Sequence, residues 1–115
     1  MLFIEYPKCS TCQKAKKYLD DNKVNYIDRH IKEDRPNKKE LDEWIKKSGK
    51  DISSFFNTSS IKYRELNLKE VLKELDYDEK LDILASDGML VKRPILVTDN
   101  IVLVGFKIKE WEEIF

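Results

Sequence analysis

The sequence is poor in several residues that mark common classes of protein. Its 115 residues include two cysteines, one histidine, three glycines and three prolines. A structural zinc site needs about four ligands, so zinc would require carboxylates or a second chain in addition to the cysteines and His30. No internal repeat or low-complexity segment is present. With so few cysteines, we expect a protein of a reducing compartment whose thiols are catalytic or sensing rather than structural.

Long apolar runs and an excess of charge of one sign are also missing. No stretch approaches the roughly 18 apolar residues of a membrane span, and the N-terminus does not resemble a signal peptide. Lysine plus arginine number 22 and aspartate plus glutamate number 22, so the formal net charge is zero. Binding to DNA phosphates needs a concentrated basic face. We therefore expect a cytoplasmic protein with no membrane segment and no direct nucleic-acid partner.

The most informative feature that is present is the segment Cys9-Ser10-Thr11-Cys12, which holds both cysteines. The apolar run at residues 2–6 is typical of a short buried strand, and apolar residues recur at helical spacing from Cys12 to Leu19. Cys9 therefore lies where a strand passes into a helix. Unpaired backbone N–H groups and the positive end of the helix dipole meet at such a junction, and both stabilise a thiolate.

This position predicts separate roles for the two cysteines. A cysteine at a helix N-terminus has a pKa lowered from about 8.5 to roughly 3.5–7.5, and its thiolate is the species that attacks. We expect Cys9 to be this nucleophile, with Lys8 and Lys14 adding positive charge nearby. Cys12, one helical turn later, would attack the mixed disulfide formed on Cys9 and release it.

Two other interpretations of the cysteine pair remain open. One is a metal site, for which the pair supplies two ligands and the rest of the chain few more. The other is a pair of small core residues, because free cysteine is among the most buried residue types. We favour the redox interpretation because Cys9 falls at the start of the helix and not on its apolar stripe.

The pattern along the chain predicts one domain over residues 1–115, of mixed α/β type. A second strand is expected at residues 24–28, with His30 as a solvated residue in the loop that follows. The next helix should begin at the cap Asn37, with Glu40 completing a capping box, and end near Gly49.

The second half of the chain contains a helical insert and then a hairpin. Helical spacing recurs at residues 68–75 and again at 81–85, where Asp78 is the expected cap. The insert covers about residues 37–88. Strands at residues 95–97 and 101–104 form a hairpin, and a terminal amphipathic helix covers residues 108–115. An α/β sandwich with a mixed four-stranded sheet is the economical arrangement.

Three segments in this order give the chain a resemblance to a known family. They are Tyr6-Pro7-Lys8-Cys9-Ser10-Thr11-Cys12, Lys92-Arg93-Pro94-Ile95 and Val104-Gly105-Phe106. With them the chain resembles, over essentially its whole length, the ArsC/Spx-like family, which is related to glutaredoxin-coupled arsenate reductases. The resemblance implies a thioredoxin-like fold with the order βαβ, helical insert, ββα.

The resemblance also implies roles for individual residues. Cys9 matches the active cysteine, and Pro94 matches the cis-proline that faces it. Arg93 matches an arginine near the active thiol that helps to hold an anion or a leaving sulfur. Ser10 and Thr11, between the cysteines, would shape the site.

The chain departs from the arsenate reductases in its charges. Their anion site resembles one cysteine with three arginines, and here only Arg93 is carried over. The other two positions fall near Asn57 and Gly105, although Lys62 or Arg64 could substitute. Those enzymes also generally lack the second cysteine of the pair.

Three functions follow as expectations. The first is a thiol–disulfide oxidoreductase that acts on an oxidised protein or a small thiol, as a monomer without a bound cofactor. A cellular reductant such as glutathione with glutaredoxin, or thioredoxin, would be its co-substrate. The alternative is an Spx-type redox-sensing regulator that binds the C-terminal domain of the RNA polymerase α-subunit, with the contact near residues 48–50. Arsenate reduction is the further alternative.

Overall fold

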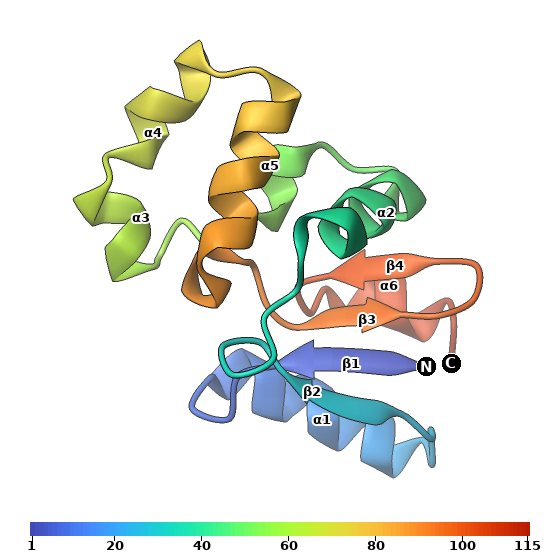
Figure 1. The fold of residues 1–115 in the computed structure, drawn as a ribbon. Coiled ribbons are helices and arrows are strands. Elements are labelled where there is room, and N and C mark those ends of the chain that lie inside the picture. Colours follow the sequence, from blue (N-terminus) through green and yellow to red (C-terminus); the bar gives the residue numbers. More distant parts are fainter.

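A four-stranded sheet forms the middle layer of the computed structural model, which describes residues 1–115 (Figure 1). The strands are β1 (Leu2–Glu5), β2 (Ile27–His30), β3 (Ile95–Val97) and β4 (Val102–Val104), in the order β2-β1-β3-β4. β1 pairs in parallel with β2, and antiparallel with β3, which pairs antiparallel with β4. The sheet is therefore mixed and four-stranded, as predicted.

Helices cover both faces of this sheet. On one face lie α1 (Ser10–Asp21) and the short α6 (Ile108–Glu112). On the other lie α2 (Lys38–Ser48) and α5 (Tyr77–Ser86), with α3 (Ile61–Glu65) and α4 (Leu68–Val71) further from the strands (Figure 1). Single 3₁₀ turns at Ile52–Phe55, Leu72–Glu74 and Gly88–Leu90 complete the helical insert. None of the helices combines the length and the apolar composition needed to cross a bilayer.

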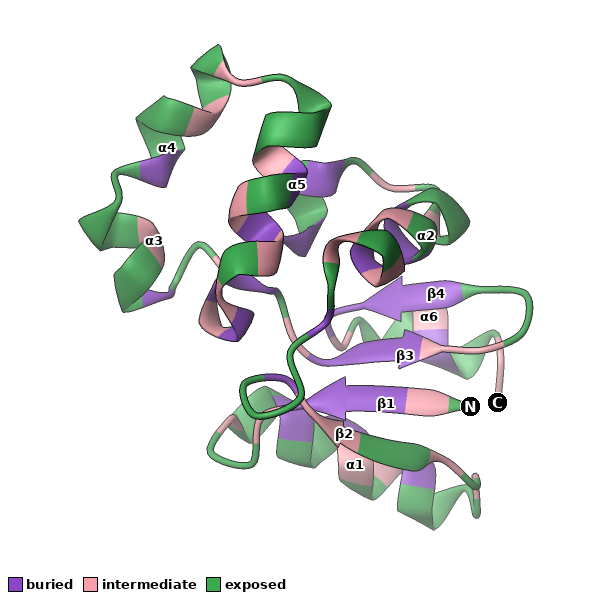
Figure 2. Ribbon diagram, viewed as in Figure 1, coloured by how far each residue is buried: buried purple, intermediate pink, exposed green.

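Two apolar cores lie on opposite faces of the sheet because successive side chains of a strand point in opposite directions. In β1, Ile4 joins the larger core with α2 and α5, whereas Phe3 joins the smaller core with α1 and α6. In β3 the same alternation separates Ile95 from Leu96. β1, β3 and β4 are buried along most of their length, whereas the edge strand β2 and the helices α3 and α4 are mostly exposed or half-buried (Figure 2). The sheet is thus the rigid platform of the molecule.

Helix α2 confirms the predicted capping signals. The Asn37 side chain accepts the N–H of Glu40, and the Glu40 carboxylate accepts the N–H of Asn37. The helix ends at Gly49, whose φ of 71° lies in the left-handed region that glycine adopts without a steric cost.

The second strand covers Ile27–His30 and not residues 24–28, so the predicted bounds are wrong. The N–H of Val24 donates to the carbonyl of Leu19 at 3.0 Å, so this segment completes the end of α1 and is not free to join the sheet. Pairing with β1 begins only at Ile27. His30 is consequently the last residue of β2 and not a loop residue.

Other predicted boundaries also needed correction. The cap of α5 is Asp76, which forms a capping box with Glu79, whereas Asp78 lies inside the helix and forms an ion pair with Lys38 at 2.9 Å. β4 begins at Val102, and the terminal helix stops at Glu112 instead of reaching residue 115. These shifts do not alter the order of the elements.

Candidate active site

The strand-to-helix junction places Cys9 at the N-cap of α1. Its extended backbone, with φ −91° and ψ 117°, lets the Sγ atom accept the N–H of Cys12 at 3.3 Å. The N–H of Cys9 donates to the Tyr6 carbonyl at 3.0 Å, which fixes the loop between β1 and α1. Both thiols are free, with Cys9 half-buried and Cys12 fully buried. Only Cys9 is open to a reactant.

The surroundings separate the acidities of the two thiols. Burial of Cys9 opposes its ionisation, but hydrogen bonds from the Cys12 thiol and N–H, together with the Arg93 guanidinium, hold its pKa below the ordinary value. Burial raises the pKa of Cys12 to about 12, and its hydrogen bond to Cys9 adds to the rise. Lys8 and Lys14 are exposed, and the cation that acts on Cys9 is Arg93.

Arg93 reaches the site from the segment before β3. The Arg93–Pro94 peptide bond is cis, in agreement with the resemblance, and the Pro94 carbonyl accepts the N–H of Gly105 at 2.8 Å. The guanidinium carbon lies 5.2 Å from the centre of the Tyr6 ring. Its Nε and Nη1 atoms are buried and have no hydrogen-bond partner. Arg93 therefore presents unused donors beside Cys9.

His30 supports this arrangement from outside the site. Its ring lies edge to face with Tyr6, with 5.6 Å between the ring centres. Its Nδ1 atom accepts the backbone N–H groups of Lys32 and Glu33, both at 3.1 Å. These contacts give His30 a structural part in the turn after β2, and it does not line the cavity described next.

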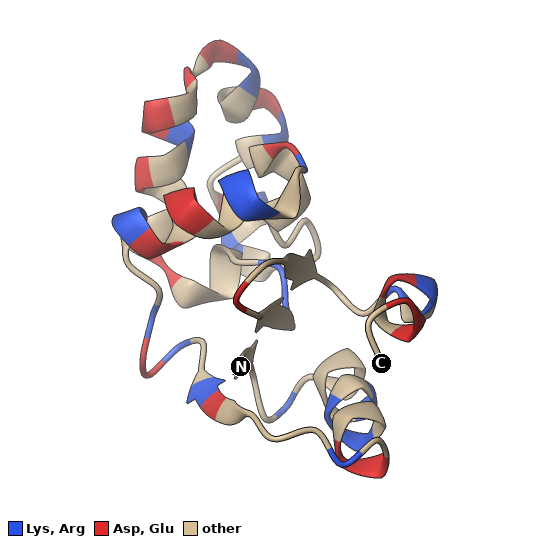
Figure 3. Cartoon of the chain, turned by 90° about the vertical axis from the view of Figure 1, so that its right-hand side faces the viewer, with Lys and Arg blue, Asp and Glu red and all other residues tan.

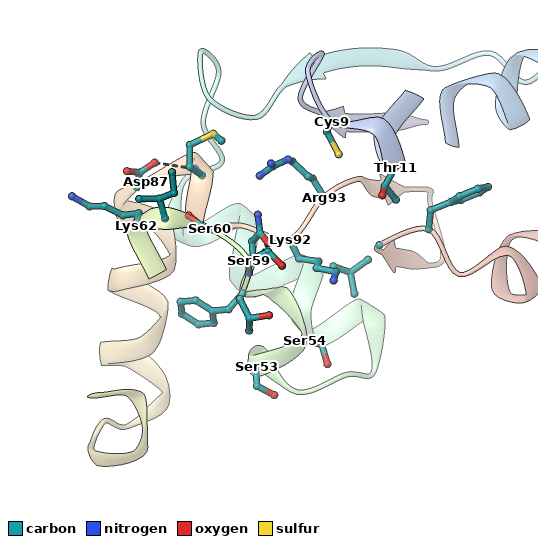
Figure 4. Close-up of a pocket in the computed structure, with 18 of the residues that line it drawn as sticks. Cys9, Thr11, Ser53, Ser54, Ser59, Ser60, Lys62, Asp87, Lys92 and Arg93 are labelled. Carbon is teal, nitrogen blue, oxygen red and sulfur yellow. Dashed lines mark hydrogen bonds between the residues drawn. The ribbon is translucent and has the colours of Figure 1, made fainter. Parts of the chain in front are cut away.

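A cavity of about 1030 Å³ opens beside Cys9, between the sheet edge and the helical insert (Figure 4). Cys9, Thr11 and Arg93 line it, whereas Ser10, Cys12 and Pro94 do not. Figure 4 shows Arg93 and Thr11 on either side of the Cys9 sulfur, with the serines of the insert across the cavity.

The positions that the resemblance compared with arginines also meet at this cavity. Asn57 and Gly105 both line it, so the segments that lie far apart in the sequence converge as implied. Lys62 lines it too, but Arg64 does not. Arg93 is thus the one arginine of the cavity.

Sequence analysis missed three further cations of the cavity, Lys50, Lys92 and Lys107. Lys50 is paired with Glu110 at 3.0 Å. Lys92 directly precedes Arg93, and its Cε atom lies 3.5 Å from the position that a Cβ on Gly105 would occupy. The position of Lys92 next to Arg93 was the one feature of the sequence that could have placed Lys92 in the site. Charge pattern could not have done so, because basic and acidic residues are mixed on every helix (Figure 3). No group of three or more His, Cys, Asp or Glu side chains could hold a metal ion.

Known proteins are similar to this chain over nearly its whole length. Residues 4–114 match the ArsC family. The uncharacterized protein YusI of Bacillus subtilis is 51% identical over 113 residues, which cover 98% of this chain and 96% of YusI. The regulatory protein MgsR of the same organism is 28% identical over 106 residues, covering 92% of this chain and 82% of MgsR.

Two crystal structures extend the likeness to the fold. A putative ArsC family related protein from Bacteroides fragilis is 49% identical with a TM-score of 0.96, covering 99% of this chain and 96% of the other. A possible arsenate reductase from Streptococcus mutans is 43% identical with a TM-score of 0.90, covering 99% and 97%. With its mixed sheet, its helical insert and its cysteine at the start of α1, the chain belongs to the ArsC family, and its fold is that of the thioredoxin-like proteins.

Proposed function

We propose that the protein is a thiol–disulfide oxidoreductase in which Cys9 attacks and Cys12 resolves. The observation that carries this proposal is the contrast between the two thiols. Cys9 is accessible, lines the cavity and has a lowered pKa, whereas Cys12 is buried, hydrogen-bonded to Cys9 and has a pKa of about 12.

In the first step the Cys9 thiolate attacks one sulfur of a substrate disulfide. A bond forms between Cys9 Sγ and that sulfur, and the bond between the two substrate sulfurs breaks. The departing half leaves as a thiolate, which the Arg93 guanidinium beside Cys9 can stabilise with its free donors.

In the second step Cys12 passes its proton to solvent and attacks Cys9 Sγ. This forms the Cys9–Cys12 disulfide and releases the retained half of the substrate as a thiolate. The substrate disulfide has then gained two electrons and the cysteine pair has lost two. A cellular thiol system, such as glutathione with glutaredoxin or thioredoxin, would return the pair to the dithiol.

Turnover with a model disulfide and a thiol reductant tests this function. We expect Cys9→Ser to abolish turnover and Cys12→Ser to accumulate a mixed disulfide on Cys9, visible as added mass on the intact protein. Circular dichroism and the unfolding midpoint of each variant serve as controls for folding. Turnover by Cys9→Ser at the wild-type rate would show that Cys9 is not the nucleophile.

Arsenate reduction is less well supported by the cavity. With Arg93 as the one arginine, a tetrahedral anion would lack the fixed bidentate donors that several guanidinium groups supply. We therefore expect weak arsenate affinity, measured by calorimetry. Tight arsenate binding would favour the reductase over the general oxidoreductase.

A redox-sensing regulator is the second candidate, because MgsR is similar over most of both chains. In this function oxidation of the pair would alter an interface and no substrate would turn over. The Spx-type resemblance names the C-terminal domain of the RNA polymerase α-subunit as the partner, near the exposed Gly49 at the end of α2. Binding of this domain to the reduced and oxidised protein separates the candidates, and absence of binding in both states removes the regulator.

A further inference from the structure

The cavity beside Cys9 gathers positively charged side chains that form no ion pair. The chain as a whole has equal numbers of acidic and basic residues. Yet Arg93, Lys62, Lys92 and Lys107 all line the cavity, and none of the ion pairs of the protein involves them. These four residues are called the free cations below.

Acidic residues of the cavity do not neutralise the free cations. Only Glu65 and Asp87 line it. The Asp87 carboxylate accepts the N–H of Met89 at 2.9 Å and so is engaged at the turn after α5. Two carboxylates therefore face four cations, and the cavity has a positive potential that attracts anions.

Arg93 marks one end of this charged region. Its buried Nε and Nη1 atoms have no partner, and a buried donor without a partner is costly unless a ligand pairs with it. The Lys92 side chain runs instead towards Gly105, on the side of the cavity formed by β4 and the loop before α6. Figure 4 shows Lys92 between Arg93 and the serines, and Lys62 at the opposite end of the cavity near Asp87. The charges are spread along the cavity and not focused on one point.

The size and lining of the cavity indicate how large its ligand is. Its volume of about 1030 Å³ is at the upper end of the roughly 300–1,000 Å³ of ordinary ligand pockets. Hydroxyl and amide side chains cover the side across from Cys9. They are Ser53, Ser54, Asn57, Thr58, Ser59 and Ser60. A polar molecule much larger than a single tetrahedral anion fits this lining.

We propose that the cavity binds disulfides whose retained half is polar and carries several carboxylates, and that Lys62, Lys92 and Lys107 select them. This inference rests on the proposed oxidoreductase function. In the exchange described above, the sulfur of the carboxylate-bearing half bonds to Cys9, and the other half departs as a thiolate. The carboxylates lie along the cavity against the lysines while Arg93 acts at the sulfurs.

Matched mixed disulfides test this selection. Each carries neutral 2-thiopyridine as the departing, coloured half. In one series the retained half is a short peptide whose cysteine is flanked by Glu, by Gln or by Lys. In the other series it is a small thiol, either mercaptosuccinate or neutral mercaptoethanol. Because charge also changes the intrinsic reactivity of a disulfide, each rate is divided by the rate of the same compound with dithiothreitol.

We expect the normalised kcat/KM to be about tenfold higher for the Glu peptide than for the Gln peptide at low salt, and the ratio to shrink as salt screens the charges. Mercaptosuccinate should exceed mercaptoethanol in the same way. A larger preference among the peptides points to acidic protein segments as the source of the substrate, and a larger preference between the small thiols points to a small carboxylated thiol.

Variants connect the preference to the named residues. Lys92→Gln and Lys107→Gln should each lower the Glu-to-Gln ratio several-fold. The matched control is Lys69→Gln, because Lys69 is exposed on α4, outside the cavity and without an ion pair. Equal normalised rates for Glu and Gln peptides, or an equal effect of Lys69→Gln, would overturn the selection. If no disulfide at all is reduced, the oxidoreductase function itself fails.

Discussion

At the scale of the residue, the half-buried Arg93 holds two buried nitrogen atoms, Nε and Nη1, that have no hydrogen-bond partner. Most buried charged groups are paired, because an isolated buried charge is very costly. Here the guanidinium is held over the face of Tyr6 at 5.2 Å, a contact that uses none of its N–H groups. The arrangement leaves the donors free for sulfur and substrate.

Removing this cation should make Cys9 less acidic. An opposite charge nearby favours the thiolate, so Arg93→Gln is expected to raise the pKa of Cys9. Cys9 is then less ionised at any pH below its new pKa, and alkylation slows there. The measurement is the rate of iodoacetamide reaction against pH in a Cys12→Ser background. An unchanged midpoint would mean that the hydrogen bonds from residue 12 alone set the acidity.

Tyr6 should act as a positioning residue for Arg93. Tyr6→Leu removes the ring face and is expected to shift the Cys9 alkylation midpoint upwards, whereas Tyr6→Phe keeps the face and should leave it in place. In an Arg93→Gln background, Tyr6→Leu should add no further shift. A further upward shift of similar size there would show that Tyr6 acts on Cys9 by another route.

Sequence alone predicted the position of Cys9 better than it predicted the residues that surround it. The N-cap position of Cys9 follows from local pattern, because strand, loop and helix are consecutive. Lys92 and Lys107 could not be assigned to the site in this way, since they reach it only after β3 and β4 form their hairpin. The Tyr6–Arg93 contact likewise joins residues from opposite ends of the chain.

At the scale of the element, the sequence predicted the start of a helix correctly where it offered only one candidate capping residue. Asn37 and Glu40 offered one arrangement, and the helix adopts it. Before α5 both Asp76 and Asp78 are followed by helix-forming residues, and the choice of Asp76 is set by the capping box with Glu79. The start of β2 was mispredicted because Val24 is engaged by the end of α1, a contact that strand propensity does not reveal.

The cap of α2 provides a stability test. Asn37→Ala removes the acceptor for the Glu40 N–H and should lower the free energy of unfolding by about 1 kcal/mol. Urea unfolding followed by circular dichroism measures the change. Asn37→Ser retains a capping oxygen and is the control. A loss from Asn37→Ala no larger than that from Asn37→Ser would mean that Arg29, which pairs with Glu40, maintains the helix start.

At the scale of the whole molecule, the two apolar cores hold different helices against the two faces of the sheet. The larger core joins the sheet to the insert that forms one wall of the cavity. The smaller core holds α1 and α6 against the opposite face. The sequence predicted the mixed four-stranded sheet and the helical insert. The placement of α3 and α4 depends on packing between helices and could not be predicted.

Trp111 connects the smaller core to the cavity. It is fully buried, and its Nε1 atom donates to the carbonyl of Gly105 at 3.2 Å. Trp111→Phe removes this hydrogen bond and part of the ring, and should lower the free energy of unfolding by about 2 kcal/mol. Chemical unfolding of the variant gives the value. A variant as stable as the wild type would show that neighbouring aromatic rings repack to fill the space.

Because Cys12 is completely buried, the rate at which its thiol is alkylated reports how often the fold opens locally. In the folded dithiol protein an alkylating reagent reaches one thiol, Cys9, and the second label is added only when the first turn of α1 opens and exposes Cys12. Counting labels by mass against time therefore reports how often this turn opens, without any probe being attached. Cys12, for which we propose the resolving role, would also report local opening of the fold.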